Sequence, residues 1–178
     1  AHILFKHLNI NQEKSTFMFE GYESKGSQNS LTVGVSRNDV DNYIDPTHGT
    51  TFSFLHKFSG GSILGGSHNY MESSVEAVAY QSLNMFESFK TYFKLRGFIG
   101  FLWKDEKHFI PETERYRLGG YDDLRGYPFW EVSPVEKRGR NPFLPYYDYH
   151  IGGDKKLFFQ LEYFLPVIPE VGIKMLLF

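Results

Sequence analysis

Arg125 has the surroundings that most clearly suggest a chemical task. It lies in the segment RLGGYDDLRGYPF, residues 117–129, which contains three glycines and one proline. Glycine permits tight backbone turns, and a guanidinium held in such a turn can extend inward and pair bidentately with a carboxylate. We therefore expect Arg125 to tie a loop to the body of the protein. The alternative is an arginine that is solvated at the surface.

The other reactive side chains show no spacing typical of a catalytic or metal site. There is no cysteine, which excludes disulfides and thiolate chemistry, and the seven histidines are scattered. The sequence has no G-x-S-x-G, no glycine-rich phosphate loop and no H-E-x-x-H. Asp122 and Asp123 form a pair that we interpret as solvated and not as a calcium site. We expect no enzyme activity, no metal and no cofactor, and a net charge of -2 does not favour nucleic acid.

A period of two in hydrophobicity predicts β-strands as the elements that position this arginine. In TYFKLRGFIGFLW, residues 91–103, one face is apolar and the other is mixed and charged. The same alternation occurs in KLFFQLEYFL (156–165), TFSFLHKF (51–58) and NSLTVGVSRN (29–38). Weaker candidates bring the expected total to about eight strands; they are Ile3 to Ile10, Ser15 to Tyr22, Ser74 to Phe86 and Val171 to Phe178.

The composition favours an antiparallel transmembrane β-barrel over a soluble β-sandwich or lipocalin-like barrel, which would share the alternation. Aromatic residues make up 18% of the chain, yet its mean hydropathy is only -0.38. The apolar faces end in Trp103 and Tyr163, as aromatic girdles do. The opposite faces carry Lys94, Arg96 and Glu162, which suit a polar lumen better than a dry core.

About 50 residues between Trp103 and Asp154 show no convincing strand. A structureless stretch of that length in a compact domain is usually functional or disordered. This one is rich in tyrosine, phenylalanine and tryptophan, which indicates a loop that packs against something. We therefore expect residues 1–178 to form a single barrel domain, with a long loop over residues 104–154 that folds inward.

Three motifs, in order, resemble those of the BamA/TamA family of outer-membrane assembly and translocation barrels. The first is GGYDDLRGY, residues 119–127, which is similar to the Gly-Gly and [VL]-Arg-Gly-[FY] signature of the family's sixth extracellular loop. The second, within SRNDVDNYIDPTHGTTFSF, resembles the family's D-N-x-x-x-P-T-x-G hairpin. The third, GGDKKLFFQLEYFLPV, looks like the strand after that loop, and the resemblance covers residues 30–178. The residues that carry the first two matches are Gly119, Gly120, Leu124, Gly126 and Tyr127, and Asp41, Asn42, Pro46 and Gly49.

The resemblance implies a location, a function and a salt bridge. The location is the outer membrane of a Gram-negative-type envelope, where membrane lipid would be a partner. The function would be biogenesis, lipid handling or membrane organisation; the alternatives are a passive pore or, less in keeping with the pattern, a soluble β-barrel binding module. Arg125 would reach into the lumen and pair with Glu162, which the alternation independently places on the polar face. The alternative is a surface position for both residues.

The sequence also departs from that family. Members carry periplasmic domains before a sixteen-stranded barrel, whereas we expect none here and about eight strands. The last segment, VGIKMLLF, lies where the family continues into an Asp that gives the arginine a second partner, and Phe178 suits a carboxy-terminal signal.

Eight strands close into a barrel too narrow to hold such a loop, and free sheet edges are costly in lipid. The chain is therefore a remnant of a larger barrel, a small barrel with the loop outside, or half of a sixteen-stranded homodimer joined by edge-strand pairing. We favour the homodimer, with the first and last strands as its seams.

Overall fold

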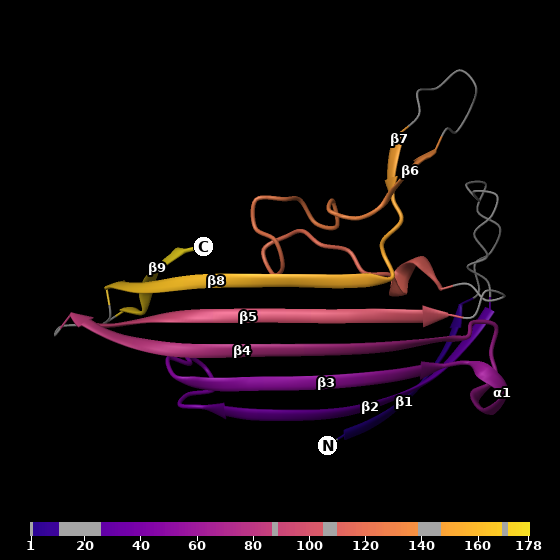
Figure 1. Ribbon diagram of the computed structural model, residues 1–178, viewed down its shortest axis with the longest axis horizontal. Coiled ribbons are helices and arrows are strands. Elements are labelled where there is room, and N and C mark those ends of the chain that lie inside the picture. Colours follow the sequence, from indigo (N-terminus) through magenta and orange to yellow (C-terminus); the bar gives the residue numbers. More distant parts are fainter. Residues whose placement is uncertain (1, 11–25, 87–88, 105–109, 139–146, 169–170) are drawn as a thin grey trace.

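One antiparallel sheet of seven strands dominates the computed structural model (Figure 1). The structure describes residues 2–10, 26–86, 89–104, 110–138, 147–168 and 171–178. The strands follow one another in the order β1-β2-β3-β4-β5-β8-β9, so each pairs with its neighbour along the chain except where the long loop intervenes between β5 and β8. Their bounds are β1 His2–Ile10, β2 Gly26–Val40, β3 Gly49–Ser59, β4 Tyr70–Phe86, β5 Phe89–Lys104, β8 Lys155–Ile168 and β9 Ile173–Leu177.

The two faces of the sheet differ as the alternation predicts. On one face, here called the outer face, large apolar side chains are exposed, such as Leu95, Phe159 and Leu161. The other face, the inner face, is the one against which the long loop packs, and Phe158 and Glu162 are buried there. Successive residues of a strand point to opposite faces, so one strand supplies both surfaces. The expected antiparallel all-β fold is confirmed.

The expected strand list needs three adjustments. The candidate strand over residues 15–22 lies outside the described residues. The long loop, expected to contain no strand, has a short hairpin of β6 (Val135–Arg138) and β7 (Tyr147–His150) and a 3-10 turn, η1 (Glu112–Glu114). Strands of four residues are too short to show a clear alternation in the sequence. The glycine-rich segment between β3 and β4 forms a single helical turn, α1 (Gly61–Leu64).

The connections sort into two ends of the sheet. At one end of the sheet, which we call the turn end, strands β2, β4 and β8 end and strands β3, β5 and β9 begin (Figure 1). The β3–β4 connection and the long loop lie at the opposite end, called the loop end. Because β5 ends at Lys104, the long loop begins at residue 105, one residue later than expected. It then folds back over the sheet near β8 (Figure 1).

The small core lies between the base of the long loop and the sheet. Tyr70 on β4, Leu102 on β5 and Ile110 in the loop form a buried cluster, and Tyr116 packs against it. The sheet itself is not closed, since β1 and β9 are its edge strands among the described residues. None of the helices that the structure describes is both long and apolar enough to span a membrane.

Candidate functional site

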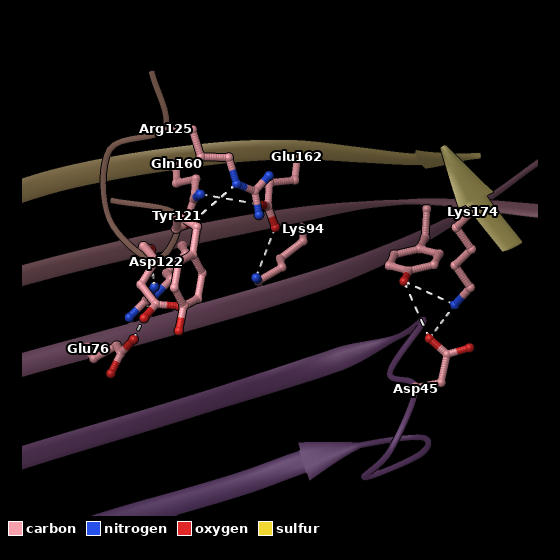
Figure 2. Close-up of polar contacts among 11 residues, drawn as sticks. Asp45, Glu76, Lys94, Tyr121, Asp122, Arg125, Gln160, Glu162 and Lys174 are labelled. Atoms are coloured by element: carbon pink, nitrogen blue, oxygen red, sulfur yellow. Dashed lines mark hydrogen bonds and ion pairs between the residues drawn. The ribbon is translucent and has the colours of Figure 1, made fainter. Parts of the chain in front are cut away.

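Arg125 and Glu162 form an ion pair on the inner face, at β8. The distance from Arg125 Nη2 to Glu162 Oε1 is 2.6 Å, and the Glu162 side chain is completely buried. Two further donors serve the same carboxylate: Lys94 Nζ at 2.9 Å and Gln160 Nε2 at 3.1 Å (Figure 2). A buried carboxylate is costly unless it is paired and hydrogen-bonded. The three donors supply that compensation, one from the loop and two from the sheet.

The remaining contacts of Arg125 orient its guanidinium. Its Nε donates a hydrogen bond to the backbone oxygen of Tyr121 at 3.2 Å, and its Cζ lies 5.0 Å from the centre of the Phe178 ring. The buried Nη1 has no hydrogen-bond partner among the described residues.

The loop motif is a tight turn that points Arg125 at the sheet. Gly119, Gly120 and Gly126 have φ angles of 123°, 96° and 92°, which disfavour other residues. At Gly119 a Cβ atom would also lie 2.2 Å from the backbone oxygen of Pro128. Gly120 forms a bridge with Leu124 and donates its N–H to the oxygen of Tyr127 at 3.0 Å, while the Tyr127 side chain is exposed.

Two more contacts hold the same turn against β5 and β8. Arg96 Nη1 donates to the backbone oxygen of Asp122 at 2.7 Å, and Arg96 also pairs with Glu76 at 2.6 Å. Lys156 Nζ lies 2.6 Å from Asp123 Oδ2. The interpretation of the two aspartates as a solvated pair is therefore wrong for Asp123, whose carboxylate is mostly buried and neutralised by a sheet lysine.

The base of the loop has its own anchor, which no motif indicated. Glu114 accepts from Lys57 Nζ at 2.6 Å and from Gln28 Nε2 at 3.4 Å. Burial opposes ionisation of Glu114, but these donors outweigh it and hold its pKa below the usual value. Tyr116 donates to Glu72 at 2.6 Å, and burial together with that carboxylate raises the pKa of Tyr116. The only signal in the sequence was the alternation, which places Lys57 on the inner face of its strand.

The hairpin motif forms a capped turn at the turn end, away from Arg125. The Asp41 carboxylate accepts backbone N–H groups of Asn42 at 3.0 Å, Thr47 at 2.9 Å and His48 at 3.0 Å, as well as the Thr47 hydroxyl at 2.6 Å. The Thr47 hydroxyl and these N–H groups hold the pKa of Asp41 far below its ordinary value. Gly49 closes the turn with a φ of 113°, and Pro46 is half-buried within it.

A residue within the same turn makes a contact with a residue 129 positions away in the chain. Asp45 forms an ion pair with Lys174 of β9, and the Tyr92 hydroxyl lies 3.4 Å from Asp45 Oδ1 (Figure 2). The β2–β3 loop therefore reaches across the inner face to the other edge of the sheet. Sequence reasoning did not select Asp45, because nothing near it in the chain indicates its partner.

Comparisons with known proteins agree with this geometry. The family model described as the Omp85 superfamily domain matches residues 4–178. The outer membrane protein assembly factor BamA of Nitratidesulfovibrio vulgaris (strain Hildenborough) is 31% identical over 146 residues, which cover 82% of this chain and 17% of that protein. The crystal structure of BamA from Haemophilus ducreyi lacking POTRA domains 1–3 has a TM-score of 0.67 at 18% identity, covering 80% of this chain and 26% of that one. At that identity the structural match shows the fold alone.

Proposed function

Because this chain belongs to the Omp85 superfamily, we propose that it acts in outer-membrane biogenesis as a barrel wall with a fixed lumen loop, and not as a catalyst. The expected resemblance to BamA-type barrels and the outer-membrane location are confirmed. The chain spans 17% of the length of the curated relative. The assembly activity in that relative's name is therefore carried to this chain only by this proposal.

The observation that carries the proposal is the attachment of the loop turn to the inner face by charged contacts. Arg125 pairs with Glu162, Asp122 accepts from Arg96 and Asp123 pairs with Lys156. A loop held in this way occupies the space through which a passive pore would conduct. The geometry therefore favours a barrel whose lumen is blocked by the loop, and not an open channel.

The lipid part of the proposal rests on the outer face. Phe98 and Phe158, two aromatic residues of the inner face, stack on each other with ring centres 5.6 Å apart. Lys156 lies over both rings, so they pack beneath a cation. We propose that membrane lipid contacts the exposed outer-face side chains such as Phe159 and Leu161. Mass spectrometry of protein purified in mild detergent should find retained lipid, and its absence would count against this part.

We also propose that two copies of the chain pair edge to edge. Among the described residues, the seven-stranded sheet has β1 at one edge and β9 at the other. Unpaired backbone groups in hydrocarbon cost several kcal/mol each, and a two-fold arrangement that pairs β1 of one copy with β9 of the other would satisfy them. The mass of the detergent-solubilised particle tests this: two chains are expected, and a monodisperse single chain would contradict it.

The decisive experiment measures membrane insertion of a client. Vesicles that contain the purified chain should accelerate folding of a small, urea-denatured eight-stranded barrel several-fold over protein-free vesicles. An unchanged folding rate would contradict the biogenesis role. Planar-bilayer conductance separates the pore alternative: the attached loop should keep currents low, whereas large steady currents in the unaltered protein would favour a pore.

A further inference from the structure

Strand β9 presents one row of side chains to the inner face, and both ends of this row make long-range contacts. β9 pairs with β8 so that Leu177 lies opposite Tyr163 and Leu176 opposite Phe164. Because side chains alternate, Lys174, Leu176 and Phe178 point to the same side as Glu162. The register continued by one residue brings Phe178 beside Glu162.

The turn-end contact of this row joins β9 to the β2–β3 loop. Lys174 forms an ion pair with Asp45, and its Nζ lies 3.4 Å from the hydroxyl of Tyr92 (Figure 2). The Tyr92 ring in turn stacks on Phe164 of β8, with ring centres 4.6 Å apart and planes 7° apart. The Asp41 carboxylate accepts the backbone N–H groups of Asn42, Thr47 and His48, so the turn is closed on both sides of Asp45.

The other contact of the row joins β9 to the long loop. The Arg125 Cζ lies 5.0 Å from the centre of the Phe178 ring, within the range of a cation–π interaction. A ring in contact with a planar guanidinium restricts its rotation, and the fork of Arg125 must hold one orientation to reach Glu162. Phe178, expected as a carboxy-terminal signal, thus also lies against Arg125, although its side chain is 74% exposed.

We propose that β9 couples the β2–β3 loop to the Arg125–Glu162 ion pair, with Asp45, Lys174 and Phe178 as positioning residues for Arg125. The physical basis is that β9 (Ile173–Leu177) carries one contact, through Lys174, and the residue directly after it, Phe178, carries the other. Its pairing with β8 is short and has a register shift between Pro166 and Ile168, so its inner-face contacts add to what holds β9 in position. Displacement of the β2–β3 loop then loosens the long loop.

The chain contains no cysteine, which permits a direct test with a spin label at one introduced cysteine. Tyr127→Cys places the nitroxide on an exposed position of the loop turn, in the full chain reconstituted in lipid. Asp45→Lys and Lys174→Asp should each shorten the label's rotational correlation time about twofold. The double variant Asp45→Lys/Lys174→Asp restores opposite charges and should return the label toward its original mobility. Asp39→Lys is the matched control, because Asp39 lies in the same hairpin and its carboxylate forms an ion pair with the exposed Arg37.

The phenylalanine contact has an independent test that leaves the Asp45–Lys174 pair intact. Phe178→Ala should mobilise the label, whereas Phe178→Trp, which keeps an aromatic face for Arg125, should not. The proposal is overturned if Arg125→Ala mobilises the label while Asp45→Lys and Lys174→Asp do not. It is equally overturned if the charge-exchanged double variant stays as mobile as the single variants, or if Phe178→Ala and Phe178→Trp behave alike.

Discussion

The ring of Tyr116 occupies the space directly beside Gly100, where any other residue would place its Cβ atom. A Cβ on Gly100 would lie 2.6 Å from both Cζ and Oη of Tyr116. The phenol oxygen also donates to Glu72 on β4, so the ring cannot move away without losing that hydrogen bond. Gly100 on β5 is therefore the position that lets the base of the long loop pack on the sheet.

Gly100→Ala should lower the free energy of unfolding by about 1–3 kcal/mol, the usual cost of overpacking. Urea titration of the detergent-folded protein measures it. Gly97→Ala is the matched control on the same strand, because its Cβ would point to the outer face and meet only the Phe159 ring, at 3.2 Å. That ring is highly exposed and can shift. Equal losses for the two variants would show that the Tyr116 contact is not responsible.

Arg125→Ala should destabilise the protein and lower the temperature at which the folded band disappears on a gel. Removing one partner of a buried ion pair costs about 3–5 kcal/mol. We expect the lower end of this range, because Lys94 and Gln160 still donate to Glu162. Arg125→Lys should recover little of the stability that Arg125→Ala loses, since an ammonium lacks the planar fork and the stacking surface of a guanidinium.

Arg37→Ala is the control for the loss of stability expected in Arg125→Ala. Arg37 pairs with Asp39, and both side chains are largely exposed, at 77% and 65%. Exposed pairs contribute about 0–1 kcal/mol, so the unfolding temperature should hardly change. An unchanged unfolding temperature for Arg125→Ala as well would show that the loop is not held by this ion pair.

The sequence predicts those parts of the fold that depend on residues close to one another in the chain. The alternation in TYFKLRGFIGFLW predicts β5 because successive side chains of a strand point to opposite faces of the sheet, so odd and even positions meet different surroundings. The glycines around Arg125 predict a tight turn because backbone conformation is a local property. Glu162 was found by combining the alternation with a family resemblance, and the structure brings it to Arg125.

The anchors that sequence missed join residues far apart in the chain. Gln28 and Glu114 are 86 residues apart, and Asp45 and Lys174 are 129 apart. Neither residue of such a pair carries a local pattern that selects the other. The register of the sheet determines which inner-face side chains meet, and register depends on tertiary packing that the alternation does not encode.

Acid should weaken the base of the loop through Glu114. Its pKa is lowered in the folded protein by Lys57 and Gln28, against the effect of burial. The ionised carboxylate therefore contributes stability above the unfolded-state pKa of about 4.3, and this contribution is lost as the pH falls through the lower folded-state value. Urea unfolding between about pH 6 and pH 3 should show this decline, and Glu114→Gln should flatten it. If Glu114→Gln shows the same pH dependence of stability as the unaltered protein, the decline in stability comes from other carboxylates.

Charge on the outer face should be tolerated only outside the hydrocarbon. Leu161 lies in the middle of β8, is 58% exposed and faces outward, so Leu161→Arg should cost about 2–4 kcal/mol in a bilayer, the range for arginine near the midplane. Tyr43→Arg is the control, since Tyr43 is 79% exposed in the β2–β3 loop, beyond the strand ends. Folding both variants into lipid vesicles and unfolding them in urea gives the comparison. Similar stabilities would mean that Leu161 does not contact lipid, and the side of the sheet assigned to the membrane would then have to be reversed.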